Sequence, residues 1–240
     1  MRPKLPDKKE LFGELRMQTD MSLDSEVIEW FIDSPTLDRS APQRLAKRAL
    51  DIAVACVSLV LLSPIIIFTA IAIKLQDGGP ILHRRRVVGI GGKEFDAFKF
   101  RSMIVDADEY LARRPEIRAA FERKFKLERD PRITALGKWL RRLSIDELPQ
   151  LLNVLRGEMS VVGPRMITAK ELEKYGSLAG LVLSVQPGVT GYWQVQGRQR
   201  TTYEERVRMD EYYIRNWSLA FDLNILLKTI PVVLLCRGAG

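Results

Sequence analysis

An unbroken apolar run, IAVACVSLVLLSPIIIFTAIAI at residues 52–73, constrains the fold of this chain more strongly than its composition does. Its roughly 22 residues are enough to cross a hydrocarbon layer of about 30 Å as a straight helix. Ser63 and Pro64 lie near its middle, however, and a proline inside a helix removes a hydrogen bond and bends the helix. The Ser63 hydroxyl can bond back to a freed carbonyl, which makes a bend tolerable in lipid. The run therefore predicts a kinked helix.

Basic residues flank this run on both sides. Those before it are Arg44, Lys47 and Arg48, and those after it are Arg84, Arg85 and Arg86. Positive charge favours the cytoplasmic side of a membrane, so a straight span would place one of the two groups on the unfavourable side. A helix that bends at Ser63-Pro64 and returns to the same face satisfies both groups. We therefore predict a re-entrant membrane helix at residues 46–76 in preference to a single span.

The remaining chain divides into two regions. Residues 1–45 are polar and mixed in charge, with one short amphipathic stretch, SEVIEWFIDS at residues 25–34, and we predict an N-terminal tail or docking arm there. Residues 77–240 predict a cytoplasmic domain. This domain ends in the short apolar stretch NILLKTIPVVLLC at residues 224–236, which is typical of an interfacial helix or helix pair.

The charge balance restricts the partners of the chain. Its 240 residues carry a formal net charge of +8, which suits nucleic acid, anionic lipid or a phosphorylated substrate. The two cysteines, Cys56 and Cys236, cannot form a disulfide framework, and His83 is the only histidine. A histidine-rich zinc site is therefore excluded. For any metal, the composition favours oxygen ligands, of the kind that bind Mg²⁺.

A β-hairpin is predicted by ILHRRRVVGIGGKEFDAFKFRSM at residues 81–103. Three glycines supply the turn between two strand-like runs, and their spacing does not match a nucleotide-binding glycine loop. Lys99 and Arg101 lie on the outgoing strand and can point to the same side, since strand side chains alternate. Residues 104–128 favour a solvated amphipathic helix pair. The expected fold class is α+β, mainly helical with a small hairpin or sheet.

Two neighbouring acids, Asp146 and Glu147, stand at the edge of an apolar stripe in LSIDELPQLLNVLRGEMSVVGPR at residues 143–165. One interpretation is purely structural. Ser144 and Glu147 have the spacing of a capping box, and Pro149 is tolerated in the first turn of a helix, so the helix would begin near Ser144–Asp146. Acids in such a turn are stabilised by the helix dipole.

The second interpretation of the acids is chemical. A helix start offers free N–H groups that suit a phosphate, and an ionised carboxylate beside a phosphate can attack phosphorus. Arg141 lies one turn earlier, and Arg165 follows a tight Val-Gly-Pro turn that can bring it back towards the acids. Downstream, QPGVTGYWQVQGR at residues 186–198 predicts a turn followed by a short strand that ends in Gly197-Arg198.

Five ordered segments resemble the bacterial sugar transferases, the monotopic phosphoglycosyl transferases. They are KRALDIAVACVSLVLLSPII, FKFRSM, DPRITALGKWLRRLSIDELPQLLNVLRGEMSVVGPR, PGVTGYWQVQGR and YYIRNWSLAFDLNILLKTI. The match covers roughly residues 45–238 and is most similar to members that act in exopolysaccharide or capsule synthesis. The chain differs from the usual Gly-Pro-Arg-Pro of the family in having Met166 after Arg165.

The resemblance implies an enzyme that transfers a hexose-1-phosphate from a UDP-sugar to undecaprenyl phosphate, with release of UMP and a requirement for Mg²⁺. It implies that Asp146 is the nucleophile, which forms a covalent phosphosugar intermediate, and that Glu147 helps to hold Mg²⁺ or assists proton transfer. Asp146 and Glu147 are thus the candidate metal ligands as well. The candidate substrate-phosphate-binding residues lie in the shared motifs: Arg141, Arg165, Lys99, Arg101, Gln194 and Arg198. Ser63 and Pro64 match the family's membrane kink.

The same resemblance implies a place at the cytoplasmic face of the bacterial inner membrane, in contact with lipid. It leaves the transferred sugar and the oligomeric state open, a homo-oligomer included. The alternative is a non-catalytic, membrane-anchored basic binding or adaptor protein, which the charge and the apolar run also permit. No aromatic-studded basic strand of an RNA-binding type is present in the sequence, so nucleic acid is not an expected partner.

Overall fold

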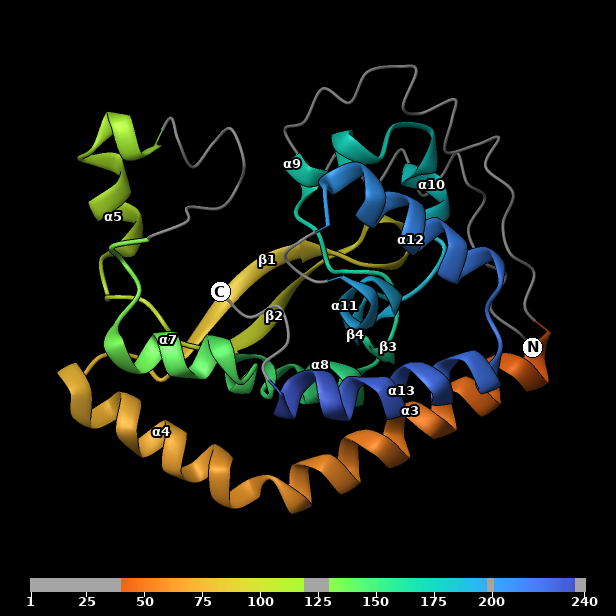
Figure 1. Cartoon of the computed structure of the whole chain (residues 1–240), viewed down its shortest axis with the longest axis horizontal. Helices are drawn as coiled ribbons and strands as arrows, with labels where there is room; N and C mark the ends of the chain where they lie inside the picture. Colours follow the sequence, from red (N-terminus) through yellow and green to blue (C-terminus); the bar gives the residue numbers. More distant parts are fainter. Residues whose placement is uncertain (1–39, 119–129, 198–200, 236–240) are drawn as a thin grey trace, which may run out of the picture.

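The computed structural model describes residues 40–118, 130–197 and 201–235 of the chain. Within them the fold is mostly helical, with two small two-stranded sheets, so the expected α+β class is confirmed (Figure 1). Almost all of the predicted N-terminal tail, residues 1–45, lies outside the described residues.

The apolar run forms two helices that meet at a bend. Helix α3 spans Ala41–Leu61 and helix α4 spans Ser63–Asp77, and their axes differ by 63°. The Ser63 hydroxyl donates to the Val60 carbonyl oxygen at 2.8 Å, as the bent-helix prediction requires. No single helix in the described part of the chain is long and apolar enough to cross a membrane, whereas α3 and α4 taken together reach that length and composition.

Helix α3 is fastened to the rest of the protein by a buried polar network. The Lys47 ammonium lies 3.3 Å from an Asp51 carboxylate oxygen and 2.8 Å from an oxygen of Asp222 in α13, and it donates to the Val162 carbonyl at 3.0 Å. Asp51 also accepts from the Ser160 hydroxyl and the Val161 N–H, each at 2.9 Å. The sequence predicts Lys47 as a flanking cation at a membrane surface. In the structure it is only 7% exposed and forms ion pairs inside the protein.

The predicted β-hairpin is confirmed. Strands β1 (Leu82–Val88) and β2 (Glu94–Phe100) are antiparallel, and the 3-10 turn η1 (Ile90–Gly92) joins them. His83 pairs with Lys99 and Arg85 with Ala97, so these odd-numbered side chains share one face. The even-numbered side chains from Arg84 to Phe98 share the other.

A second sheet pairs β3 (Ser160–Val162) with β4 (Gly188–Thr190) in parallel. Its crossover contains α9 (Ala169–Leu172), η3 (Glu173–Leu178) and α10 (Ala179–Val182). The strands approach so closely that a Cβ on Gly188 would lie 2.1 Å from the Gly163 backbone nitrogen, so a side chain there would force them apart. Met166, which follows in the chain, is buried in the core.

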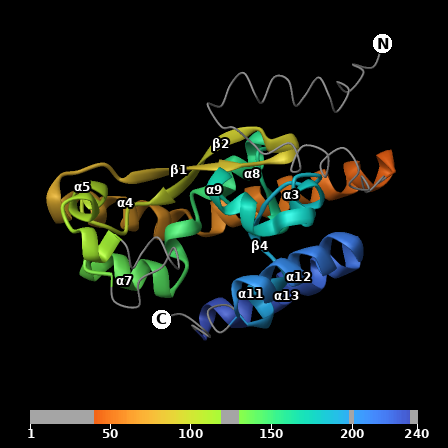
Figure 2. The same ribbon diagram turned by 90° about the horizontal axis from the view of Figure 1, so that it is seen from above.

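The segment after β4 differs from its prediction. The sequence predicts a short strand that runs to Gly197, whereas the structure has a short helix, α11 (Tyr192–Gln196). The Gly191 carbonyl accepts the N–H groups of Gln194 and Val195, so the backbone bonds locally instead of extending the sheet. Helices α12 (Tyr203–Arg215) and α13 (Leu219–Leu234) complete the described chain, and α13 is one helix, not a pair. Figure 2 shows the hairpin and the α12–α13 pair on opposite sides of β4.

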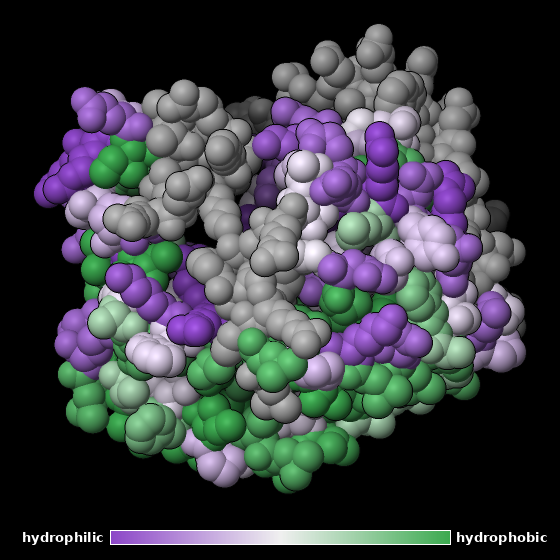
Figure 3. Space-filling view, viewed as in Figure 1, coloured by the Kyte–Doolittle hydropathy of each residue, from purple (hydrophilic) through white to green (hydrophobic). Residues whose placement is uncertain are grey.

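One face of the molecule is apolar. In Figure 3 it forms the lower edge, where α3, α4 and α13 lie. Helix α4 exposes Ile67, Phe68, Ile71 and Leu75, helix α3 exposes Val57, Val60 and Leu61, and α13 exposes Leu223, Leu227 and Ile230. This many large apolar side chains on one face are typical of a surface that contacts lipid or protein.

Candidate active site

The two acids lie in a 3-10 turn of their own. Helix α7 (Ala135–Arg142) leads through Leu143 and Ser144 into η2 (Ile145–Glu147), and α8 (Gln150–Arg156) begins only after Pro149. Ser144 adopts a left-handed backbone conformation, with φ 57°, and is the only non-glycine residue to do so in the described part of the chain. Strained backbone of this kind gathers at functional sites.

The predicted capping box is wrong. The Ser144 side chain makes no capping bond, and the Glu147 N–H donates instead to the Ser144 carbonyl oxygen at 3.3 Å. The reason is the left-handed Ser144, which starts a tight turn with bonds between residues three apart. The acids therefore precede the helix that was expected to begin with them.

Asp146 is buried and electrostatically perturbed. Asp146 is 6% exposed. Burial, together with the charge of the neighbouring Glu147, raises the pKa of its carboxyl group. Lys99 and Arg141 oppose this rise, because their positive charges favour the ionised form. A carboxylate that is shielded from water and lies near two cations is poorly hydrated. Poor hydration favours its attack as a nucleophile.

Lys99 connects the hairpin to the acids. Its ammonium group lies 2.7 Å from a Glu147 carboxylate oxygen, and both side chains are largely shielded from solvent. Lys99 comes from β2, Arg141 from α7 and the acids from η2. The structure thus brings together four of the predicted site residues, which are Asp146, Glu147, Lys99 and Arg141.

A cluster of three arginines lies beside these four residues. Arg85 of β1 bonds Glu171 at 3.0 Å, and burial together with nearby Arg165 and Arg206 lowers the pKa of Arg85. Burial alone would raise the pKa of Glu171, but the Thr168 N–H and the surrounding arginines hold it below its ordinary value. The charge of Glu147 also acts on Arg85, so the arginine cluster adjoins the acids.

The arginine cluster carries excess positive charge. Three guanidinium groups act on the carboxylate of Glu171, and a second nearby acid, Asp210, has its pKa raised to about 7 by burial. A region with more half-buried cations than ionised acids binds an anion favourably. The arrangement can therefore hold a doubly charged group such as a diphosphate.

Aromatic rings and unpaired polar atoms border the same cluster. The guanidinium carbon of Arg206 lies 4.0 Å from the Tyr203 ring centre, and that of Arg165 lies 5.1 Å from the Trp193 ring centre. Among the buried polar atoms without a hydrogen-bond partner in the described part of the chain are Nε1 of Trp193, Oε1 of Gln194, and Nε and Nη2 of Arg206. Buried polar atoms normally have partners, so these atoms are available to a polar ligand.

Of the other predicted phosphate-binding residues, one has a structural role and one lies outside the described part of the chain. Arg101 is 7% exposed, with its guanidinium bonded to Asp77 at the end of α4 and to the Pro80 carbonyl oxygen. These bonds tie the bent helix pair to the hairpin and leave Arg101 engaged away from the acids. Arg198 lies outside the described residues.

Sequence reasoning missed Arg85, Glu171 and Arg206. The sequence indicates Arg85 only as part of a flanking basic group, although strand alternation places it on the same face as Lys99. Glu171 and Arg206 have no such signal, because they lie in two separate helices, α9 and α12, whose packing brings them to Arg85 from distant parts of the chain.

The residues present fit a divalent cation that is shared with a substrate. No group of three or more His, Cys, Asp or Glu side chains within the described residues can hold a metal unaided. Asp146 and Glu147, however, are adjacent acids, the charge of Glu147 raises the pKa of Asp146, and a cation between them would relieve that repulsion. Mg²⁺ commonly binds through one or two carboxylates together with substrate phosphates.

Known proteins resemble this chain over most of its length. The model of the family described as "Bacterial sugar transferase" matches residues 42–236. The exopolysaccharide production protein ExoY of Rhizobium meliloti is 45% identical over 199 residues, which are 81% of this chain and 88% of ExoY. The undecaprenyl-phosphate galactose phosphotransferase of Salmonella typhimurium is 44% identical over 227 residues, 92% of this chain and 47% of that protein.

A third relative, the UDP-glucose:undecaprenyl-phosphate glucose-1-phosphate transferase of Escherichia coli, is 40% identical over 200 residues, 80% of this chain and 40% of that protein. The chain thus spans less than half the length of several curated relatives and most of the length of ExoY. The family match extends from the first turn of α3 to the end of α13 and includes every residue of the site. The chain belongs to the bacterial sugar transferase family.

Proposed function

We propose that this protein transfers a hexose-1-phosphate from a UDP-sugar to undecaprenyl phosphate, giving the lipid-linked diphosphosugar and UMP. The relatives named as undecaprenyl-phosphate galactose and glucose phosphotransferases support this reaction. The observation that carries the proposal is Asp146, a buried carboxylate that faces Glu147, Lys99 and Arg141 beside a cluster of arginines. The reaction would serve exopolysaccharide or related glycoconjugate synthesis, as the name of ExoY indicates for that relative.

In the first half-reaction, a carboxylate oxygen of Asp146 attacks the phosphorus that bears the sugar. The new bond joins the Asp146 oxygen to phosphorus, and the bond that breaks is the one to the bridging oxygen, which leaves with UMP. In the second, a phosphate oxygen of undecaprenyl phosphate attacks the same phosphorus and releases the Asp146 carboxylate. Covalent catalysis of this kind divides one difficult displacement into two easier ones.

The surrounding charges suit these two steps. Arg85, Arg165 and Arg206 can bind the donor diphosphate, since guanidinium groups match phosphate oxygens in pairs. Lys99 holds the Glu147 carboxylate in place beside Asp146. Lys99 and Arg141 favour the ionised, nucleophilic form of Asp146 against the opposing effect of burial.

Asp146 and Glu147 would also hold Mg²⁺ together with the donor phosphates. The ion would supply positive charge to the transferring phosphoryl group and to the leaving UMP. The rise that the Glu147 charge causes in the pKa of Asp146 supports this assignment, because a cation shared by both acids would remove the repulsion.

The apolar face supports a site at a membrane surface. We infer that α3 and α4 enter one leaflet and return to the same side, and that α13 lies in the interface beside them. Trp139 of α7 and Leu152 of α8 are exposed next to the acids, which suits contact with a lipid acceptor. The exposed cations that flank the helix pair, Arg44, Arg84 and Arg86, favour the cytoplasmic face of the inner membrane, and the relatives' lipid acceptor favours a place at a membrane.

The test is a reaction of the purified protein in lipid nanodiscs with a panel of UDP-sugars and Mg²⁺. We expect UMP and a lipid-linked diphosphosugar to appear in equal amounts with at least one donor once undecaprenyl phosphate is added. A membrane-anchored binding or adaptor protein would release no UMP with any donor. That result would overturn the proposed reaction.

A further inference from the structure

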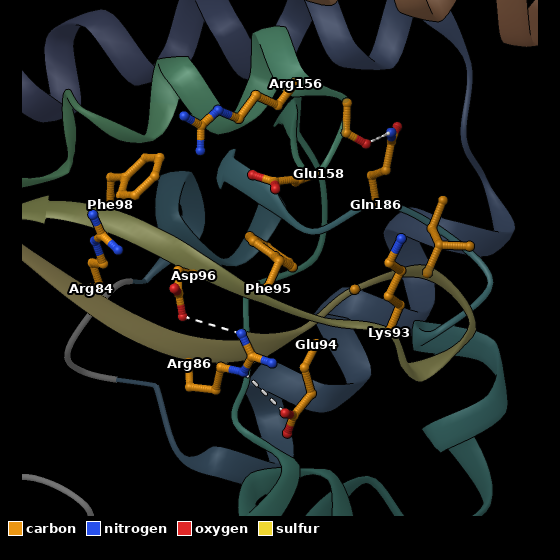
Figure 4. A pocket seen from close by; sticks show the side chains of 13 residues that line it. Arg84, Arg86, Lys93, Glu94, Phe95, Asp96, Phe98, Arg156, Glu158 and Gln186 are labelled. Atoms are coloured by element: carbon orange, nitrogen blue, oxygen red, sulfur yellow. Dashed lines mark hydrogen bonds and ion pairs between the residues drawn. The ribbon is translucent and has the colours of Figure 1, made fainter. Parts of the chain in front are cut away.

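A cavity of about 630 Å³ opens beside the hairpin (Figure 4). Its walls are the outward side chains of β1 and β2, the turn between these strands, the end of α8, and Gln186. The even-numbered residues Arg84, Asp96 and Phe98 lie on this face, whereas Lys99 and Arg85 lie on the other. The cavity is therefore separated from the candidate active site by the hairpin itself.

The charged groups in the cavity do not balance. Arg86 is paired with Glu94 at 3.0 Å and with Asp96 at 3.4 Å, and the third acid, Glu158, accepts a bond from Asn153. The other cations of the lining are Arg84, Lys93 and Arg156. The guanidinium carbons of Arg156 and Arg84 lie 4.8 Å and 6.0 Å from the Phe98 ring centre, so both border its ring. The cavity thus offers positive charge around an aromatic floor.

One segment of this chain has the complementary chemistry. Residues 17–38 contain six acids and no lysine or arginine, in a chain whose net charge is +8. The acids are Asp20, Asp24, Glu26, Glu29, Asp33 and Asp38, and Trp30 and Phe31 lie among them. Residues 1–39 lie outside the described part of the chain. In the sequence, the segment ends at residue 38, just before the start of α3 at Ala41.

The segment can reach the cavity. Ser40 caps α3, and Arg48 lies eight residues later, about 12 Å along the helix axis. Arg48 bonds the carbonyl oxygens of Val154 and Leu155, and its guanidinium borders Gly157, which lines the cavity. The eleven residue-to-residue steps from Glu29 to Ser40 can extend over roughly 36–40 Å. The acidic segment, which is joined to the start of α3, is thus long enough to reach the cavity.

We propose that the acidic segment at residues 24–33 docks into this cavity within the same chain. Its carboxylates pair with Arg84, Lys93 and Arg156, and Trp30 or Phe31 packs against Phe98. Aromatic rings between guanidinium groups add cation–π attraction to the ion pairs. The docking is independent of the proposed reaction, because none of these cavity residues lies in the candidate active site.

The test is hydrogen exchange on the full-length protein in nanodiscs, read at the backbone amides of residues 24–33. A segment that is docked for nine-tenths of the time exchanges about tenfold more slowly than a free one. Arg84→Glu combined with Arg156→Glu should remove that protection. The triple change Glu26→Lys, Glu29→Lys and Asp33→Lys should do the same, and the two sets together should restore it. Arg208→Glu, an exposed cation on α12, is the matched control and should change nothing.

Three results would overturn the proposal. The first is unchanged exchange in the Arg84→Glu and Arg156→Glu protein while the amides of β1 and β2 remain protected. The second is protection that requires lipid and ignores these arginines, which would place the segment on the bilayer. The third is protection that rises with protein concentration, which would mean docking onto a second copy. UMP release should stay within about twofold in the cavity variants, so a failure of docking is distinguishable from a failure of the proposed reaction.

Discussion

Replacement of Lys47 by methionine tests whether the buried network of α3 stabilises the whole fold. In the wild type the Lys47 ammonium lies between the buried carboxylates of Asp51 and Asp222. Lys47→Met keeps most of the side-chain volume but leaves both carboxylates without their cation. Removal of one partner from a buried ion pair costs about 3–5 kcal/mol. For a chain of this size, that corresponds to a fall in Tm of about 10 °C.

The assay is thermal unfolding of the detergent-solubilised protein. The matched control is Arg44→Met, which removes an exposed cation from the same flank and should cost less than about 1 kcal/mol. A second variant, Lys47→Met with Asp222→Asn, should recover part of the loss because one uncompensated charge is gone. If Lys47→Met lowers Tm no more than Arg44→Met does, Lys47 is only a flanking cation and the reasoning about the network is wrong.

Three further outcomes are expected. Arg85→Gln should raise the KM for the UDP-sugar at least about tenfold, since it removes a guanidinium from the diphosphate region, while Arg84→Gln on the opposite face of the hairpin should stay within about twofold. Ser63→Leu with Pro64→Leu should straighten the helix pair and move one flank across the membrane, which cysteine labelling from the two sides would detect. The pKa of Asp210 is raised to about 7, so between pH 4 and pH 7 this carboxyl group binds more protons in the folded than in the unfolded state. The free energy of unfolding should therefore fall by about 4 kcal/mol as pH rises through that range. The Tm of Asp210→Asn should therefore exceed that of the wild type at pH 8 by more than at pH 4, and equal differences at both pH values would contradict the buried, proton-binding carboxyl group.

Local features of the fold were predictable from the sequence. The bend at Ser63-Pro64 depends on a proline and a hydroxyl within one turn, and the structure has both the bend and the Ser63 bond to Val60. The hairpin depends on glycines between two strand-like runs, and it too is confirmed. Each of these is decided by a few neighbouring residues.

Features that depend on distant contacts were not predictable in the same way. Lys47 resembles a membrane flank until Asp222, from the other end of the chain, is packed against it. The capping box failed because Ser144 adopts a left-handed conformation, which the spacing of Ser144 and Glu147 does not reveal. The acids themselves were found from their motif, but the arginine that joins them to the rest of the site, Arg85, becomes visible only through the strand register.

Mass spectrometry of the Asp146 peptide tests the central claim most directly. Purified protein would be mixed with a UDP-sugar and Mg²⁺ without any lipid acceptor, quenched and digested. We expect the peptide that contains Asp146 to gain one hexose phosphate, less one water, while about one UMP per protein is released in a burst. Asp146→Asn retains the size of the side chain and should show neither the adduct nor the burst. Substantial turnover by Asp146→Asn, or release of UMP only after undecaprenyl phosphate is added, would contradict Asp146 as the nucleophile.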